Sequence, residues 1–350
     1  MGRSDDMNDA APALLWCKVR ESQAVRCVLC AHRCVIQPGE RGLCGVRENR
    51  GGTLYSLVYG KPVSIAVDPI EKKPLFHFMP GSMSLSLATV GCNFSCVFCQ
   101  NSDISQMPKE RSWIAGRTVS PGEVVEAALQ AHCRSISYTY TEPTVFYEYA
   151  RDCASLAAAA GLKNVFVTNG YMTAATLRDM DGLLDAANVD LKAFSDDFYR
   201  FMAGARLKPV LDSIRRLWKM GVWVEVTTLL IPGMNDREDE LRALASFLVS
   251  VSPDIPWHVS RFYPAYRLRD VPPTPVASIE RALEIGREEG LHFVYGGNVP
   301  GHASESTTCP QCGLLVIERH GFAVSKNLLR EGRCPRCGRE IAVQEKEAAR

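Results

Sequence analysis

The sequence predicts an α/β fold: a partial (β/α)6-type TIM barrel with an N-terminal cysteine-rich module and a C-terminal zinc ribbon. Between residues 85 and 298, apolar segments typical of buried strands alternate with segments typical of helices. On either side of this region, cysteines gather in short clusters with the spacing of metal ligands. We therefore expect an N-terminal metal module with a hairpin at residues 1–80, the barrel at 81–300 and the ribbon at 301–345. The hairpin would consist of two short strands within residues 53–67, around a turn at Gly60–Lys61–Pro62.

The central region contains seven apolar segments that we interpret as parallel strands, because helical segments separate them. The first long helix should begin after Ser120, a capping residue followed by Pro121 and Glu123. An open doubly wound sheet is the alternative, but no glycine-rich dinucleotide motif follows the first strand. The expected strands are 85–91, 135–143, 164–170, 188–194, 222–233, 257–264 and 291–298, and the expected helices include 120–132, 144–161, 173–186, 236–251 and 275–290.

The charge balance excludes some classes of partner. Among 350 residues, 40 are basic and 39 acidic, and the formal net charge is +1. Such a chain has no overall field that would attract nucleic acid or an anionic membrane. The first residues lack the apolar core of a signal peptide, and no segment approaches the roughly 18 apolar residues of a membrane helix. We expect a cytoplasmic protein that binds neither membranes nor nucleic acid.

The chain contains 14 cysteines. Structural disulfides are rare in the reducing cytoplasm, so metal binding is the natural explanation for so many thiols. Three clusters account for all of them except Cys17, Cys133 and Cys153.

The second cluster lies in GCNFSCVFCQN, residues 91–101, and its cysteines are Cys92, Cys96 and Cys99. Four-iron clusters usually take four thiolates, so three thiolates leave one iron open, as a catalytic metal site requires. Phe98 is placed to shield a cofactor from water. A zinc loop with a distant fourth ligand is the alternative. The loop follows the first predicted strand, and the carboxyl ends of parallel barrel strands carry the chemistry, which favours the catalytic interpretation.

Further polar residues follow other predicted strands, namely Glu142, Asn169, Lys192 and Asn298. A parallel barrel would gather them at the same face as the three cysteines. A lysine that ends a buried strand needs an anionic partner or an exit to water. Lys192 is therefore a candidate for binding an anionic group of a cofactor.

The third cluster consists of two C-P-x-C-G knuckles, which are typical of a zinc ribbon. So short a unit has little core of its own, and bound zinc would fold it. One alternative is a module that recognises nucleic acid or protein, and another is a rubredoxin-like iron site. The four ligands would be Cys309, Cys312, Cys334 and Cys337.

The first cluster is Cys27-x2-Cys30-x3-Cys34-x9-Cys44. Four thiolates can close a zinc site or hold an auxiliary iron–sulfur cluster, and the spacing differs from that of bacterial ferredoxins. His32 could replace one of the thiolates. The sequence leaves both metals open.

The C-x3-C-x2-C loop, with an aromatic residue before its last cysteine, resembles the signature of radical S-adenosylmethionine (SAM) enzymes. The resemblance implies a 4Fe–4S cluster whose open iron is chelated by the methionine part of SAM. One electron from that cluster would yield methionine and a 5′-deoxyadenosyl radical, which takes hydrogen from a substrate. A donor such as flavodoxin or ferredoxin would supply the electron.

Other segments are similar to those of the enzymes that activate pyruvate formate-lyase. YTYTEPT (138–144) resembles a short acidic motif that holds the methionine amine, with Glu142 as the matching carboxylate and with Tyr140 and Thr141 in place of the family's usual glycines. Thr141 and Glu142 are therefore candidates for binding SAM. TNG, DLK and IPG, which contain Asn169 and Lys192, resemble further segments of these enzymes. GGN (296–298) would place Asn298 near the adenine.

Taken together, GERGLCGVREN, DPIEKKPLFHF, GCNFSCVFCQN, YTYTEPT, VDLKAF and the CPxCG tail resemble the radical SAM enzymes of the "AmmeMemoRadiSam" system. That resemblance implies Memo-type and AMMECR-type proteins as partners and leaves the substrate unidentified. Activation of a glycyl-radical enzyme is the alternative function. A non-catalytic iron–sulfur or zinc protein is a more distant one.

Overall fold

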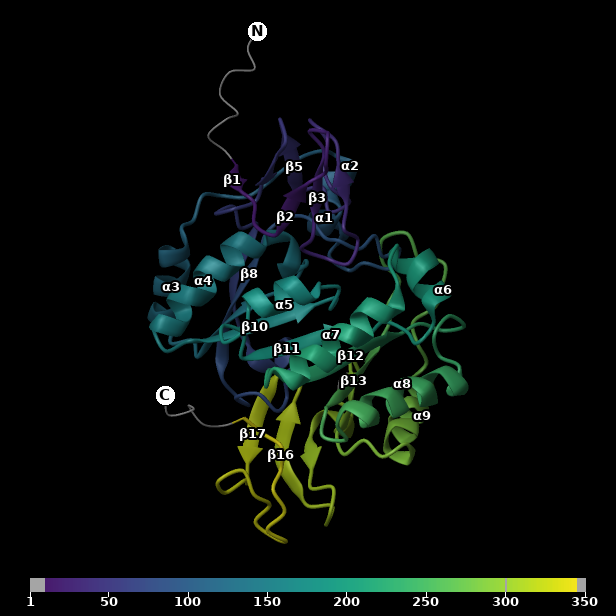
Figure 1. Cartoon of the computed structure of the whole chain (residues 1–350). Helices are drawn as coiled ribbons and strands as arrows, with labels where there is room; N and C mark the ends of the chain where they lie inside the picture. Colours follow the sequence, from purple (N-terminus) through teal and green to yellow (C-terminus); the bar gives the residue numbers. More distant parts are fainter. Residues whose placement is uncertain (1–9, 300, 345–350) are drawn as a thin grey trace.

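The computed structural model describes residues 10–299 and 301–344. An eight-stranded sheet occupies its centre, in the order β14-β13-β12-β11-β10-β9-β8-β7 (Figure 1). Strands β8 to β14 are parallel to their neighbours, whereas β7 pairs with β8 in the antiparallel sense. The strands are β7 (Ser64–Pro69), β8 (Met83–Ala88), β9 (Ser135–Tyr138), β10 (Lys163–Thr168), β11 (Ala186–Asp190), β12 (Trp223–Leu230), β13 (Trp257–Arg261) and β14 (Val294–Gly297).

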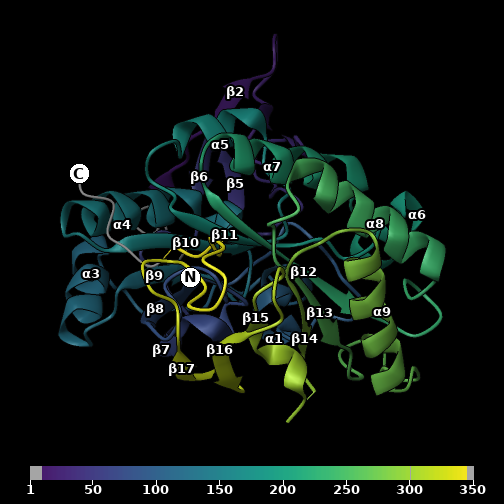
Figure 2. The ribbon, with the colours of Figure 1, turned by 90° about the horizontal axis from the view of Figure 1, so that it is seen from below.

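The strands follow one another in sequence order, so the doubly wound alternative, which needs a reversal of strand order, is wrong. β7 and β14 are the two edges of the sheet, and the barrel is therefore open rather than closed. Figure 2 shows helices in an arc outside the strands. They are α3 (Pro121–Gln130), α4 (Tyr147–Ala159), α5 (Ala174–Asp179), α7 (Leu207–Lys219), α8 (Glu238–Val251) and α9 (Val276–Glu288).

Local sequence signals explain where these helices begin and end. The Ser120 side chain accepts a hydrogen bond from the Glu123 backbone, and the Glu123 carboxylate accepts one from the Ser120 backbone nitrogen. Together they form the capping box at the start of α3. α5 is much shorter than the helix expected at 173–186, because Gly182 adopts a left-handed φ of 74° before β11 begins. No helix in the described residues is long and apolar enough to cross a membrane.

Two expected strands also differ from the structure. The strand expected at 135–143 ends at Tyr138, because Tyr140 has a φ of 62° and Pro143 starts the short helix η3 (Pro143–Phe146). The strand expected at 291–298 is limited to β14.

The N-terminal module consists of two small antiparallel sheets. The hairpin expected within residues 53–67 is wrong: β6 pairs with β5 across Gly51 and Gly52, while β7 joins the central sheet. Both glycines have positive φ, as a two-residue hairpin turn requires. The domain boundary expected at residue 80 consequently separates β7 from its partner β8. The module's strands are β1 (Ala11–Pro12), β2 (Trp16–Lys18), β3 (Val25–Cys27), β4 (Val35–Ile36), β5 (Arg47–Arg50) and β6 (Thr53–Ser56).

A three-stranded antiparallel sheet forms the C-terminal unit, at the end of the molecule opposite the N-terminal module (Figure 1). Its strands are β15 (Thr307–Thr308), β16 (Leu315–His320) and β17 (Ala323–Asn327). It contacts the segment between β7 and β8, where Arg319 Nη2 donates to the Phe76 carbonyl over 2.5 Å. Glu225 binds the same segment from β12, since its carboxylate accepts from the backbone of Phe76 and of His77.

His77 lies at this junction with both ring nitrogens engaged. Nδ1 is 2.6 Å from the Ala342 carbonyl and Nε2 is 2.5 Å from the Tyr295 hydroxyl. Burial lowers the pKa of His77 to about 4, whereas an unfolded histidine titrates near 6.5. The unfolded chain therefore binds a proton that the folded chain does not, in the window between these two pKa values.

We expect the free energy of unfolding to fall as the pH drops from about 6.5 to about 4, by up to about 3 kcal/mol from His77 alone. Thermal unfolding followed across this window measures the effect. His77→Gln should flatten the pH dependence, and substitution of the exposed His320 by Gln should leave it unchanged. Equal pH dependence in wild type and His77→Gln would contradict the assignment.

Candidate active site

A cavity of about 220 Å³ lies at the carboxyl ends of the parallel strands. Most of the strand-end residues expected to meet there do line it. They come from the loops after β8, β9, β10, β11 and β14, and are Cys92, Cys96, Phe98, Cys99, Thr141, Asn169, Lys192 and Asn298. The structure does not bring Glu142 into this lining. Sequence reasoning missed further lining residues, among them Gln106, Asp190 and Ser260.

The cysteine loop depends on a close approach at Gly91. Its φ is 99°, and a Cβ atom there would lie 2.6 Å from Val46 Cγ1 of the N-terminal module. Any side chain would therefore force the loop and the module apart. On its other side the loop is fixed by backbone hydrogen bonds, from Ser95 to Ala203 and from Val97 to Met202.

Hydrogen-bond donors surround the thiol of Cys92. Asn169 Nδ2 and the backbone nitrogen of Phe94 each lie 3.4 Å from its Sγ. Burial raises the pKa of Cys92 to about 12 and that of Cys96 to about 11. Such thiols deprotonate when a metal supplies compensating positive charge. The site has thiol ligands and N–H donors in place for a metal centre.

Lys192 and Asp190 form an ion pair at the wall of the cavity, with 2.9 Å between Nζ and Oδ2. Burial alone would lower the pKa of Lys192, but attraction to Asp190 and to the sulfur of Cys96 raises it above the ordinary value. The ammonium therefore stays charged at neutral pH. Asp190, two residues earlier at the end of the same strand, is therefore the anionic partner expected for this buried lysine.

Other parts of the lining present neutral polar or apolar groups. Asn298, with a φ of 59°, donates from Nδ2 to Ser260 Oγ over 3.0 Å and to the Arg261 carbonyl over 3.2 Å. Thr141 donates to the Thr89 carbonyl over 2.9 Å. Phe98 packs 5.9 Å from Phe198, measured between ring centroids. This part of the cavity can offer apolar surface and uncharged hydrogen-bonding groups to a ligand.

Glu142 is fully buried beneath the cavity, and donors on two loops occupy its carboxylate. Thr144 donates from its backbone and hydroxyl to Oε1, Thr168 Oγ1 lies 2.8 Å from Oε1, and the Asn169 backbone nitrogen lies 2.7 Å from Oε2. Burial raises its pKa and these hydrogen bonds lower it, with a net increase. Glu142 thus holds Asn169 in place rather than facing the cavity itself.

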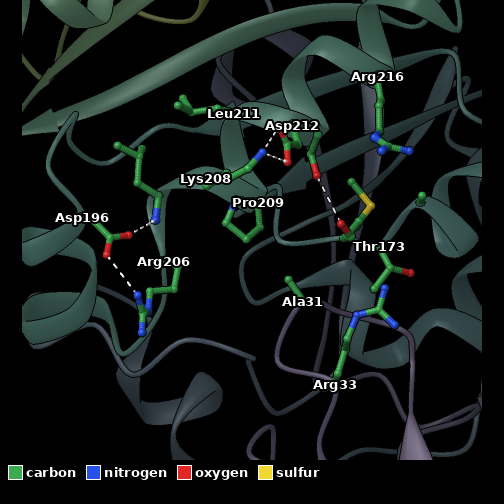
Figure 3. A pocket seen from close by; sticks show the side chains of 14 residues that line it. Ala31, Arg33, Thr173, Asp196, Arg206, Lys208, Pro209, Leu211, Asp212 and Arg216 are labelled. Atoms are coloured by element: carbon green, nitrogen blue, oxygen red, sulfur yellow. Dashed lines mark hydrogen bonds and ion pairs between the residues drawn. The ribbon is translucent and has the colours of Figure 1, made fainter.

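A larger cavity, of about 660 Å³, lies elsewhere, between the N-terminal module and the start of α7 (Figure 3). None of the residues expected at the active site lines it. Many of its charges are already paired within the chain, as Arg206 is with Asp196 at 3.4 Å and Lys208 with Asp212 at 2.7 Å. The smaller cavity, which gathers the reactive side chains, is therefore the candidate active site.

The other two cysteine clusters are also brought together. Cys309 and Cys337 have their sulfurs 3.6 Å apart, as do Cys312 and Cys334, and all four thiols lie within 4.8 Å of one another. This group could hold a metal ion. The N-terminal cysteines instead surround a small cavity of about 20 Å³, which is lined by Cys27, Cys30, Cys34 and Cys44 among others.

Glu142→Gln should lower the free energy of unfolding by about 1–3 kcal/mol, because an amide places an NH2 group against donors that need an acceptor. Chemical unfolding of the metal-free protein measures this loss. The matched control is Glu126→Gln on exposed α3, expected to change stability by less than about 0.5 kcal/mol. A Glu142→Gln protein as stable as the control would contradict the role of this carboxylate.

Residues 86–245 match the family described as Radical SAM superfamily. The chain is 47% identical over 326 residues to the uncharacterized protein MJ0808 of Methanocaldococcus jannaschii, which covers 92% of this chain and 96% of that protein. It is 24% identical over 169 residues to the pyruvate formate-lyase-activating enzyme of Streptococcus mutans, covering 45% of this chain and 63% of the enzyme.

Among solved structures, Streptococcus suis SuiB bound to S-adenosylmethionine has a similar fold, with a TM-score of 0.50 at 13% sequence identity. The similarity covers 65% of this chain and 53% of SuiB. The match of residues 86–245 identifies the superfamily, and the similarity to the Methanocaldococcus protein extends over nearly the whole chain. The chain belongs to the radical SAM superfamily and is a radical SAM enzyme.

Proposed function

We propose that Cys92, Cys96 and Cys99 bind a 4Fe–4S cluster, and that SAM occupies the adjoining cavity at the cluster's open iron. The observation that carries this proposal is that three thiols and a charged Lys192–Asp190 pair line one cavity. The described lining includes no fourth cysteine, so one iron would lack a protein thiolate. A reduced cluster of this kind supplies the electron that cleaves SAM into methionine and a 5′-deoxyadenosyl radical.

The residues around the thiols suit such a cluster. Asn169 Nδ2 and the Phe94 backbone nitrogen point at Cys92 Sγ, and Ser105 Oγ lies 3.2 Å from Cys99 Sγ. Hydrogen bonds to thiolate sulfur stabilise the reduced, more negative state of an iron–sulfur centre. Glu142 acts one step away, since it fixes the backbone from which Asn169 reaches the sulfur.

The cavity also matches the chemical groups of SAM. Lys192 offers a cation to the methionine carboxylate, and Asp190 offers an anion to the methionine amine or the sulfonium. Asn298 and Ser260 offer amide and hydroxyl groups to the adenosine. Thr141 and Phe98 complete the lining, with Phe98 limiting the access of water.

Abstraction of a hydrogen atom needs a substrate, and reduction of the cluster needs an external one-electron donor. Flavodoxin and ferredoxin are suitable classes of donor. We favour a small metabolite or a partner protein of the Memo or AMMECR type as substrate. Activation of a glycyl-radical enzyme is the second candidate, and the similarity to pyruvate formate-lyase-activating enzyme favours it. The N-terminal module and the ribbon lie outside the matched superfamily region.

At the ribbon we propose a structural zinc ion. Tetrahedral zinc–thiolate bonds of about 2.3 Å place neighbouring sulfurs about 3.8 Å apart. The sulfur separations of 3.6 Å between Cys309 and Cys337, and between Cys312 and Cys334, fit this geometry. Zinc there would stabilise a unit that contacts the base of the sheet through Arg319.

The anaerobically reconstituted protein, given dithionite and SAM, should produce 5′-deoxyadenosine, and Cys96→Ala should abolish production because the cluster loses a ligand. Chromatographic quantification of the product measures this. Cys17→Ala is the control, since Cys17 is exposed and belongs to none of the clusters. If wild type with a fully loaded cluster makes no 5′-deoxyadenosine, the proposed function is refuted.

A further inference from the structure

The N-terminal cysteines line a cavity that lies apart from the active-site cavity. Cys27 and Cys44 are buried, and Cys30 and Cys34 are partly exposed. We infer that these four thiols hold an iron–sulfur cluster of the four-iron type rather than a single zinc ion. This inference goes beyond the proposed function and does not depend on it.

The N-terminal thiols are spaced more widely than those of the ribbon. Among the described residues, only the ribbon group has three or more cysteine, histidine or carboxylate ligand atoms within 4.8 Å of one another. Zinc requires sulfurs about 3.8 Å apart, which the ribbon satisfies and the N-terminal thiols do not. A four-iron cluster binds each thiolate to a different iron and so needs wider spacing. The active-site thiols, for which we propose such a cluster, likewise do not all lie within 4.8 Å of one another.

The N-terminal thiols also surround a small opening. Sulfurs 3.6 Å apart, as in the ribbon, are in van der Waals contact and leave room for no more than an ion. The N-terminal thiols instead surround an opening of about 20 Å³, which exceeds the volume that one water-sized probe requires. Ile36 and Val145 contribute apolar walls to this opening. The four thiols therefore stand around a shared space instead of in contact with one another.

Two residues that line this cavity each carry a buried donor without an acceptor. Arg47 is 2% exposed; Nη1 binds Glu148 over 2.8 Å and Nη2 binds the Leu14 carbonyl over 2.5 Å, but Nε has no partner. Asn93 is 3% exposed, and its Nδ2 also has no partner. Both residues line the cavity. An unsatisfied buried donor costs about 1–3 kcal/mol, and the inorganic sulfides of a cluster would accept both N–H groups.

Asn93 also links this cavity to the active site. It follows Cys92 directly, and its Oδ1 accepts from Asn169 Nδ2 over 3.1 Å. Its carbonyl oxygen lies 2.8 Å from His32 Nε2, and His32 also lines the N-terminal cavity. A Cβ on Gly91 would lie 3.1 Å from the Cys44 carbonyl. The two cysteine sites therefore share a wall formed by residues 91–93.

The test uses a full-length variant without the active-site ligands, Cys92→Ala, Cys96→Ala and Cys99→Ala combined. After anaerobic reconstitution with iron and sulfide, we expect about four irons per chain and, on reduction, the electron paramagnetic resonance signal of a four-iron cluster. Further Cys30→Ser and Cys34→Ser substitutions should remove both. A triple variant that contains no iron and about two zinc ions per chain would overturn the inference.

Wild-type protein gives the same answer if the triple variant fails to fold. We expect about eight irons and about one zinc per chain, whereas about four irons and about two zinc ions would overturn the inference. A failure of wild type to form 5′-deoxyadenosine would refute the proposed function but not this inference. The inference is tested by metal counts in a triple variant that cannot form that product. The two proposals therefore fail independently.

The role of Asn93 has its own readout. Asn93→Asp keeps the Oδ1 acceptor and removes the Nδ2 donor, so the reduction potential of the remaining cluster in the triple variant should become more negative. A potentiometric titration followed by electron paramagnetic resonance measures the shift. An unchanged or more positive potential would overturn the assignment of this donor to the cluster.

Discussion

Parallel pairing of strands in sequence order is the constraint on which the active site depends. Because β8 to β14 run in the same direction, every loop that follows one of them emerges at the same edge of the sheet. The cysteine loop follows β8, at one side of that edge, and Asn298 follows β14 at the other side. The open barrel curves these ends toward one another, so residues more than 200 positions apart line one cavity. No single segment of the chain contains the site.

Buried glutamates join the parts of the molecule around this sheet. Glu148 on α4 binds Arg47 and the backbone of Leu14, and so fixes the N-terminal module. Glu225 on β12 binds the segment between β7 and β8, against which the ribbon lies. Glu142 binds the loops after β9 and β10. Each carboxylate accepts several hydrogen bonds, as a buried charge requires. Loss of one acceptor should therefore disturb a junction rather than a single contact.

The alternation of apolar and helical segments was sufficient to predict the sheet, because each strand is buried and each crossover carries a helix. The shape of the loops was not predictable in the same way. Tyr140 and Asn298 adopt left-handed φ angles that non-glycine residues rarely adopt, and tertiary contacts hold them there. β6 pairs with β5 across the turn at Gly51–Gly52, whereas the sequence made the turn at Gly60–Lys61–Pro62 equally plausible.

The same distinction applies to the site. Cysteine spacing and strand-end position led to the three thiols, to Asn169 and to Lys192, because the chemistry of these residues is visible in the sequence. Asp190 could have been found from its place at the same strand end. The burial of Glu142 depends on donors from two loops, which the sequence does not pair. That Arg47 Nε is buried without a partner likewise depends on tertiary packing and could not be predicted from the sequence.

The central claim is that SAM binds in the cavity at the open iron held by Cys92, Cys96 and Cys99. Electron–nuclear double resonance of the reduced protein, saturated with SAM labelled at the methionine amine and carboxylate, tests it most directly. Both labels should show hyperfine coupling to the cluster, because both groups would be ligands of the open iron. SAM bound at saturation with no coupling to either label would contradict the account.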